Sequence, residues 1–156
     1  MSVSVSVHEH LKGKGINYDL LYHPHSRTSL ESARLARVSP QQVVKGVLTH
    51  DGENYVLCVM PSNHHLCISW LNKAMNGNFS LVSEHRLGEF FDDCEVGAIP
   101  ALGQVYGIHV VWDDALADRD DLYIESGDHE NLIHVDRGAF MELMGGQQHM
   151  TISFPG

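Results

Sequence analysis

Apolar residues follow two different spacings along this chain, and the two spacings alternate. Runs rich in Val, Leu, Ile and Tyr predict strands at residues 18–22, 43–49, 55–60, 79–82, 105–112, 122–125 and 132–135. Apolar residues three or four apart predict helices at residues 9–14, 28–37, 69–75, 83–91 and 136–144. The alternation predicts an α/β (α+β) fold in a single domain without internal repeats.

Three short polar motifs mark where these elements begin or turn. The pair Asp51-Gly52 between two apolar runs predicts a tight β-hairpin. Thr28 followed three residues later by Glu31 predicts a capping box at the start of a helix. Asp136 predicts the cap of the last helix.

A lysine stands in the middle of the apolar strand VVKGVL. Because side chains alternate between the two faces of a strand, Lys45 shares its face with Val43 and Val47. Burying an unpaired ammonium group costs several kcal/mol. Lys45 must therefore extend its amine to solvent, pair with a carboxylate or face a ligand cleft. Gly46 leaves the opposite face without a side chain, which favours close packing of another element there.

The segment GAIPALG, residues 97–103, is rich in glycine and proline and precedes an apolar strand. Such a composition is typical of ordinary tight turns. It also suits a rigid loop in which Gly97 and Gly103 let main-chain N–H groups approach a ligand oxygen. Donors of this kind stabilise the oxyanion in ester hydrolysis, and losing one typically costs about 10²–10³ in rate. The lysine and the loop together favour an anionic or carbonyl-bearing ligand.

Composition narrows the class of protein. The 156 residues are 43% apolar and 19% charged, which is typical of a globular chain. The formal net charge of −10 argues against a broad basic surface for duplex nucleic acid, so no DNA partner is expected. The chain shows neither a membrane-span pattern nor a secretory-signal pattern, so no membrane partner is expected. Three cysteines without CxxC spacing are expected to be reduced thiols, which places the protein in the cytoplasm.

Several motifs in a fixed order carry a family resemblance. They read HP…T, VVKGVL, a hairpin, YVLCVMP, FFDDCEVGAIPALGQVYGI and LYIESGDHENLIHVDRGAF. This order closely resembles the YbaK/ProX superfamily of free-standing aminoacyl-tRNA deacylases, which are related to the editing domain of bacterial prolyl-tRNA synthetases. The resemblance implies a curved, barrel-like mixed sheet with surrounding helices, in a deacylase-like domain at residues 16–144. A helical lead-in at 1–15 precedes it, and a loosely held C-terminal tail at 145–156 follows it.

The resemblance also implies an activity, the trans-editing hydrolysis of the ester bond of mischarged aminoacyl-tRNA, without a cofactor. The family's strand lysine matches Lys45, which would anchor the acceptor-end adenosine or its phosphate. The family's GxxPxG loop matches Gly97, Pro100 and Gly103, whose backbone would hold the scissile carbonyl and position water.

Four further positions match the family's pocket. The late glycine matches Gly127, and the polar residue just after it matches His129, an accessory group that would contact the amino acid or the terminal ribose. His23 and Thr28 match a pocket-proximal HP…T segment, where substrate contact is expected. The implied partner is the acceptor end of aminoacyl-tRNA, and an aminoacyl-tRNA synthetase is a candidate second partner.

Two observations leave alternatives open. The twelve histidines show no HExxH spacing and no nearby third ligand, so no metal site is expected. Asp128 and Glu130 follow Gly127 and are poor neighbours for a phosphate backbone. The alternative to a hydrolase is a non-catalytic, regulatory module of the same fold that binds an aminoacyl or nucleotide ligand.

Overall fold

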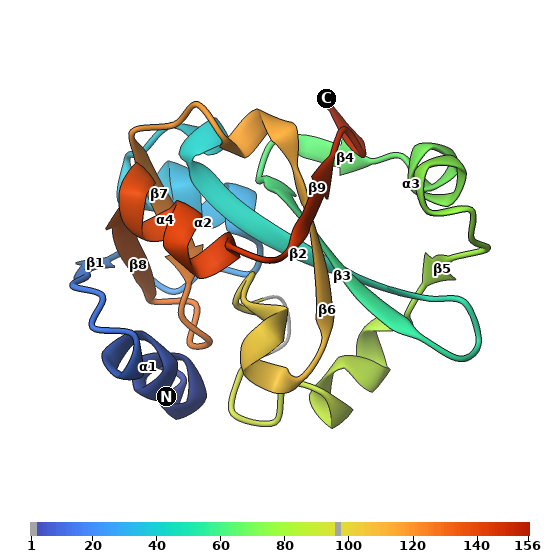
Figure 1. The fold of residues 1–156 in the computed structure, drawn as a ribbon. Coiled ribbons are helices and arrows are strands. Elements are labelled where there is room, and N and C mark those ends of the chain that lie inside the picture. Colours follow the sequence, from blue (N-terminus) through green and yellow to red (C-terminus); the bar gives the residue numbers. More distant parts are fainter. Residues whose placement is uncertain (1–2, 96–97) are drawn as a thin grey trace.

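The computed structural model describes residues 3–95 and 98–156. Within these residues a mixed β-sheet forms the centre of the molecule, and helices lie against it (Figure 1). The α-helices are α1 (Val5–Gly13), α2 (Ser29–Ala36), α3 (Ile68–Met75) and α4 (Arg137–Met144). The 3-10 helices are η1 (Pro40–Gln42), η2 (Glu84–Glu89), η3 (Gly103–Tyr106) and η4 (Asp114–Leu116). The strands are β1 (Asp19–Tyr22), β2 (Val43–His50), β3 (Tyr55–Pro61), β4 (His64–Leu66), β5 (Ser80–Leu81), β6 (His109–Asp113), β7 (Asp121–Glu125), β8 (Asn131–Asp136), β9 (Gln148–Met150) and β10 (Ser153–Pro155).

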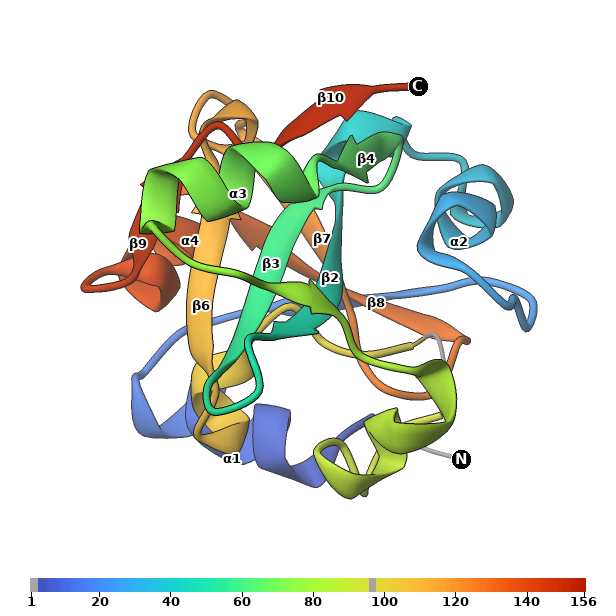
Figure 2. The same cartoon turned by 90° about the vertical axis from the view of Figure 1, so that its right-hand side faces the viewer.

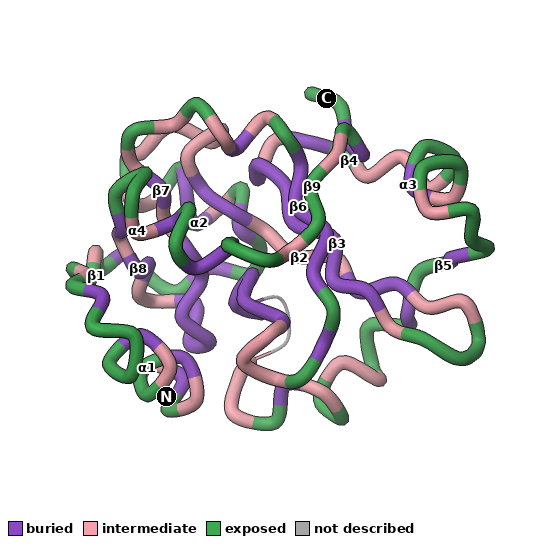
Figure 3. Tube along the Cα trace, viewed as in Figure 1, coloured by how far each residue is buried: buried purple, intermediate pink, exposed green. Residues whose placement is uncertain are grey.

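The main sheet has the strand order β1-β8-β7-β2-β3-β6-β9, and β5 pairs with β2. The antiparallel hairpin β2–β3 lies at its centre and pairs in parallel with β7 on one side and β6 on the other. A second sheet joins β4 and β10. The central strands are largely buried along the trace (Figure 3). This mixed, single-domain architecture confirms the predicted fold class.

The short polar motifs act as predicted, with one difference. The Asp51 carboxylate accepts two backbone N–H groups within the hairpin turn. The Thr28 hydroxyl accepts the N–H of Glu31 at 3.1 Å and caps α2. The Glu31 carboxylate accepts the N–H of Arg27, one residue before the position that a reciprocal capping box uses. Asp136 caps α4.

The two faces of the sheet are covered differently. Helices α1 and α4 and the segment 98–108 pack on one face and form the largest apolar cluster. The opposite face is divided, because Val43 packs with Ala33 of α2, whereas Val47 packs against the cluster that contains Leu71 of α3. Figure 2 shows α2 and α3 on either side of the β2–β3 hairpin. Lys45 shares this face with Val43 and Val47, as predicted, and lies between the two apolar clusters.

A polar cluster fastens α1 to the rest of the domain. Ser4, the N-cap of α1, donates from its hydroxyl to Asp93 at 2.7 Å, and Tyr106 donates to the other oxygen of that carboxylate at 2.7 Å. Val7 and Leu11 of α1 are fully buried in the main core. The N-terminal helix is therefore part of the packed domain.

The expectation of a loosely held tail at 145–156 is wrong. Strand β9 adds to the main sheet beside β6, and β10 pairs with β4. The buried Asp113 carboxylate explains the order of this segment, because it accepts the backbone N–H groups of Ile152 and Ser153, both at 2.9 Å. A buried carboxylate requires such donors. One Asp113 oxygen accepts the N–H of Ala115 at 2.8 Å, and the C-terminal segment supplies the donors to the other oxygen.

Two predicted elements take a different form. The strand predicted at 105–112 begins only at β6, because Gly107 has φ +72° and ends η3. The helix predicted at 83–91 is the 3-10 helix η2.

Candidate functional site

Lys45 reaches out of the sheet between α2 and α3. Its ammonium group donates to the main-chain carbonyl of His64, the first residue of β4. The side chain is half-buried, and this burial lowers the pKa of Lys45 below its ordinary value. The lysine is therefore a partly desolvated cation held by one neutral acceptor, and an ammonium group has three N–H donors, so it can serve a further acceptor.

A cavity of about 220 Å³ opens beside Lys45. One wall is the first turn of α2, where the backbone N–H groups and the helix dipole favour a negative group. The other walls come from the β3–β4 turn and the C-terminal segment. The lining residues are Thr28, Ser29, Leu30, Lys45, Ser62, Asn63, His65 and Gly156. The fold thus brings together two of the predicted site residues, Lys45 and Thr28, in a cavity suited to an anion or a carbonyl oxygen.

A buried carboxylate lies behind this cavity. Glu125, at the end of β7, is 0% exposed. The hydroxyl groups of Ser29 and Ser32 donate to it at 3.4 and 3.2 Å. The parallel register pairs Val44 with Ile124, so the next step along both strands sets Lys45 beside Glu125. Through Ser29, which lines the cavity, the carboxylate is connected to the lysine pocket.

Sequence reasoning did not identify Glu125, Ser29 or Ser32. The signal that could have identified Glu125 is its position as a carboxylate at the end of the apolar run LYIE, because a charged residue at the end of a buried strand is a candidate functional residue. The two serines are three residues apart on α2, which places them on one helix face. The pairing of that face with Glu125 depends on the packing of α2 on the sheet.

His129 belongs to this cluster and does not line the cavity. Its Nδ1 atom lies 3.6 Å from the Glu125 carboxylate, and its side chain is 3% exposed. The residue adopts a left-handed conformation with φ +60°, and its carbonyl accepts the N–H of Ser26. The predicted contact of His129 with substrate therefore stays a prediction, and in this structure its neighbour is the carboxylate.

His23 and Gly127 shape the same region. His23 is buried, and its ring nitrogen Nδ1 lies 2.7 Å from the Pro24 carbonyl. The backbone N–H of His23 donates to the Glu130 carbonyl. Gly127 has φ +107°, a conformation that favours glycine. A Cβ on Gly127 would lie 3.0 Å from the sulfur of Cys94. Both residues fix the turn that carries His129 and lie outside the lining of the lysine cavity.

Of the predicted glycine–proline loop, Gly97 lies outside the described residues. Pro100 and Gly103 are buried. A Cβ on Gly103 would lie 3.0 Å from a methyl of Val110 and 3.2 Å from the carbonyl of Ile108, so close packing on β6 explains this glycine. The Gly103 carbonyl accepts the N–H of Ile108 at 2.9 Å.

The segment before this loop meets the turn that carries His129. Glu95 donates its N–H to the Gly127 carbonyl at 2.7 Å, and its carboxylate lies 3.1 Å from His25. The His25 ring contacts the His129 ring edge-on, with a centroid distance of 5.6 Å. Glu95 therefore lies on the His129 side of the cluster, and Lys45 lies on the other side of Glu125 and Ser29.

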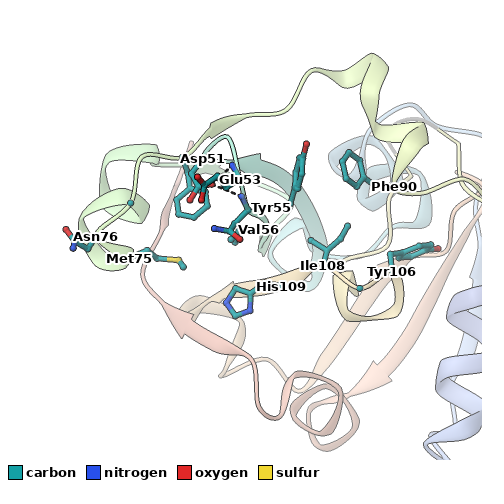
Figure 4. Close-up of a pocket in the computed structure, with 14 residues that line it drawn as sticks. Asp51, Glu53, Tyr55, Val56, Met75, Asn76, Phe90, Tyr106, Ile108 and His109 are labelled. Atoms are coloured by element: carbon teal, nitrogen blue, oxygen red, sulfur yellow. Dashed lines mark hydrogen bonds between the residues drawn. The ribbon is translucent and has the colours of Figure 1, made fainter.

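A larger cavity than that of Lys45 lies elsewhere among the described residues. It has a volume of about 750 Å³ and lies beside the end of the β2–β3 hairpin. Figure 4 shows Tyr55, Phe90 and Tyr106 on one side of it and Met75 on the other. None of the predicted site residues lines this cavity, so its size alone does not make it the site.

Residues 3–95 and 98–156 contain no group of three or more His, Cys, Asp or Glu side chains arranged to hold a metal ion. None of the helices in this part of the chain has the length and apolar character to cross a membrane.

A family model described as "Aminoacyl-tRNA editing domain" matches residues 23–143. No curated protein shows a significant match. Among solved structures, that of hypothetical protein APE2540 superposes with a TM-score of 0.84 at 24% identity, over 96% of this chain and 99% of that chain.

Two further solved structures share the fold. One, described as "a putative trans-editing enzyme for prolyl tRNA synthetase", has a TM-score of 0.81 at 18% identity and covers 99% of this chain and 100% of its own. The other, a "Putative signal transduction protein" from Marinobacter aquaeolei VT8, has a TM-score of 0.77 at 15% identity. It matches 97% of this chain but only 31% of its own length.

Proposed function

The chain belongs to the family of aminoacyl-tRNA editing domains, and from that premise we propose that it hydrolyses the ester bond of mischarged aminoacyl-tRNA in trans. The observation that carries the proposal is the position of Lys45, a partly desolvated cation in a cavity whose wall is the first turn of α2. A phosphate or carbonyl oxygen of the acceptor end suits this cavity. The proposed place of action is the cytoplasm.

In the proposed reaction, water adds to the carbonyl carbon of the aminoacyl ester. The bond between that carbon and the ribose oxygen breaks, the ribose oxygen takes up a proton, and the amino acid and the free tRNA leave. The ester is already activated, so holding water and substrate in place supplies much of the acceleration. A Ser-His-Asp triad is not required.

Each predicted residue has a part in this proposal. Lys45 anchors the terminal adenosine or its phosphate, and Thr28 sets the start of α2 beside it. Main-chain groups of the loop from Gly97 to Gly103, stiffened by Pro100, hold the scissile carbonyl.

The buried cluster positions these groups. Glu125 fixes the Ser29 hydroxyl at the cavity wall and holds His129 on the other side. His129 is the accessory group nearest to the loop, and His23 and Gly127 maintain the turn that presents it. This arrangement would orient a bound ester between the lysine and the loop.

The first test measures release of labelled amino acid from one tRNA that has been mischarged with alanine, cysteine or serine. Lys45→Ala and Lys45→Met should each lower the single-turnover rate on the susceptible substrate by about 10²-fold or more. Lys45→Met keeps the length of the apolar stem, so its loss of activity isolates the ammonium group.

The matched control is Lys73→Ala, because Lys73 is exposed on α3 and does not line the lysine cavity. Its rate should equal that of the wild type. Unchanged turnover in folded Lys45→Met would refute the assigned role of Lys45, and the absence of turnover with every substrate would refute the hydrolase.

A second candidate function is a non-catalytic module that binds an aminoacyl or nucleotide ligand. The observation that favours it is the same fold within a much longer chain described as a signal transduction protein. Saturable, Lys45-dependent binding of mischarged tRNA without release of amino acid would support this candidate over the hydrolase.

A further inference from the structure

The positive charges of this acidic protein are unevenly placed. The chain has 10 Lys and Arg residues against 20 Asp and Glu residues. Four of the ten, Arg27, Arg34, Arg37 and Lys45, fall within the nineteen positions that contain α2 and the start of β2. Helix α2 and its flanks thus have a higher density of cations than the rest of the chain, and Glu31 is the one acidic residue among these nineteen positions.

A second cavity, of about 520 Å³, adjoins the lysine cavity along α2. The two share Thr28 and Leu30 in their linings, so they form one continuous surface from Lys45 to the end of the helix. The other lining residues are Glu31, Ala33, Arg34, Arg37, Val38 and Pro40. The floor is therefore apolar, and two guanidinium groups stand at its rim.

The arginines on this surface are available to a partner. Arg27, Arg34 and Arg37 are exposed. Within residues 3–95 and 98–156, the ion pairs of arginine are those of Arg86 with Glu89 and of Arg137 with Asp120. The α2 arginines thus carry no carboxylate partner, although the protein has an excess of acidic side chains.

We propose that this surface binds the single-stranded acceptor end of RNA. The terminal nucleotide occupies the lysine cavity, and the preceding nucleotides lie along α2. Their phosphates pair with Arg34 and Arg37, and a base rests on the apolar floor formed by Leu30, Val38 and Pro40. The proposal rests on the proposed function, because it takes the aminoacyl end of tRNA as the ligand of the lysine cavity.

The dimensions of the surface agree with this occupant. The eight residues of α2 rise about 12 Å, and a stacked strand advances about 3.4 Å per nucleotide. The helix therefore accommodates about three or four nucleotides, the length of a short single-stranded end. A duplex would meet the acidic remainder of the surface, so the charge distribution favours a short single strand over a duplex.

The test uses the full protein and uncharged tRNA with a fluorescent label, and it measures binding by anisotropy over a range of salt concentrations. Arg34→Gln and Arg37→Asn are the variants. Asn suits position 37 because Arg37 has φ +60°, a conformation that Asn tolerates. Each should weaken binding about tenfold at low salt, and each should reduce the slope of log Kd against log salt by about 0.7.

The matched control is Lys73→Gln on α3, which should leave both the affinity and the slope unchanged. A thermal melt of each variant shows whether it is folded. If folded Arg34→Gln and Arg37→Asn bind tRNA like the wild type, or if Lys73→Gln causes the same loss, the proposal is wrong.

Failure of this proposal and failure of the proposed function are distinguishable. Binding of uncharged tRNA needs no turnover, so arginine-dependent binding without deacylation would reject the hydrolase and keep the RNA surface. Lys45-dependent deacylation that is insensitive to Arg34 and Arg37, with unchanged tRNA binding, would keep the hydrolase and reject the RNA surface. With an aminoacyl-adenosine substrate, the arginine variants should react like the wild type, because that substrate ends at the lysine cavity.

Discussion

Gly103 lies in the loop that we propose to be catalytic, but its packing alone explains why this residue is a glycine. Its missing side chain lets η3 approach β3 and β6, and a Cβ would meet Val110, Ile108 and Leu57 at 3.0 to 3.2 Å. These contacts are closer than side chains normally make, and two of them involve buried strands. The glycine therefore sets the shape of the loop from the inside.

We expect Gly103→Ala to lower the free energy of unfolding by about 1–3 kcal/mol, because the added methyl group overpacks a closed core. The measurement is urea unfolding followed by circular dichroism. Gly13→Ala is the control, since a Cβ there meets nothing within 4 Å and alanine favours the helix. Equal stability of the two variants would mean that the core around Gly103 yields easily.

At the scale of single residues, the sequence predicts individual site residues better than it predicts the side chains that contact them. Lys45 was predicted because an ammonium group in an apolar strand needs a physical reason, and strand parity gave its face. The capping role of Thr28 follows from local chemistry, whereas its place in the pocket follows from the family resemblance. Glu125 was missed because its partners Ser29 and Ser32 reach it only through the packing of α2 on β7, which no local pattern encodes.

At the scale of elements, α1 is held in the domain by hydrogen bonds to the Asp93 carboxylate as well as by apolar contacts. Burial opposes ionisation of Asp93, but hydrogen bonds from Tyr106 and Ser4 outweigh it and hold the pKa of Asp93 below its usual range. The carboxylate is therefore charged in the folded protein near neutral pH. It connects the N-cap of α1 to η3 and to the segment before the glycine–proline loop.

The depressed pKa gives a pH dependence with a definite sign. The stabilisation from Asp93 is complete well above its unfolded pKa of 3.8 and is lost as the pH falls through the lower folded value. Asp93→Asn should lower the free energy of unfolding by about 1–3 kcal/mol near neutral pH. Urea unfolding at several pH values should show this difference shrinking below pH 3.8. A difference that grows in acid would contradict the assignment.

The sequence predicted helices and hairpins better than it predicted the ends of the sheet. The hairpin and the caps of α2 and α4 depend on neighbours within a few residues, so local rules found them. Strands β9 and β10 lie in the polar segment GGQQHMTISFPG, whose order comes from a carboxylate on β6. Long-range satisfaction of a buried charge leaves no local signal.

At the scale of the whole molecule, the C-terminal segment ties distant parts together. It adds β9 to the main sheet, pairs β10 with β4 and brings Gly156 to the lysine cavity. Strand β4 also supplies the carbonyl that accepts a hydrogen bond from Lys45. By pairing with β4, the C-terminal segment therefore helps to hold that carbonyl in place.

Removal of residues 145–156 should therefore destabilise the domain by about 3 kcal/mol or more, since the Asp113 carboxylate would lose its three donors from Ile152 and Ser153 and keep the N–H of Ala115. Differential scanning calorimetry of the shortened chain measures the effect. Ser153→Ala in the full chain is the milder companion. It keeps the backbone donors and removes the hydroxyl, which donates to Asp113 at 2.7 Å and lies 2.8 Å from His64 Nδ1, and it should cost about 1 kcal/mol. A shortened chain as stable as the full one would show that Asp113 finds other donors.

The Asp113 contact also sets an order of events during synthesis. A nascent chain emerges from its N-terminus, and β6 leaves the ribosome well before residues 152 and 153. Until those two residues emerge, one oxygen of the carboxylate lacks its protein donors and needs water, which keeps the edge of the sheet beside β6 open. Strands β9 and β10 therefore close this edge late, and a pause in translation between β6 and residue 152 would prolong an open, aggregation-prone intermediate.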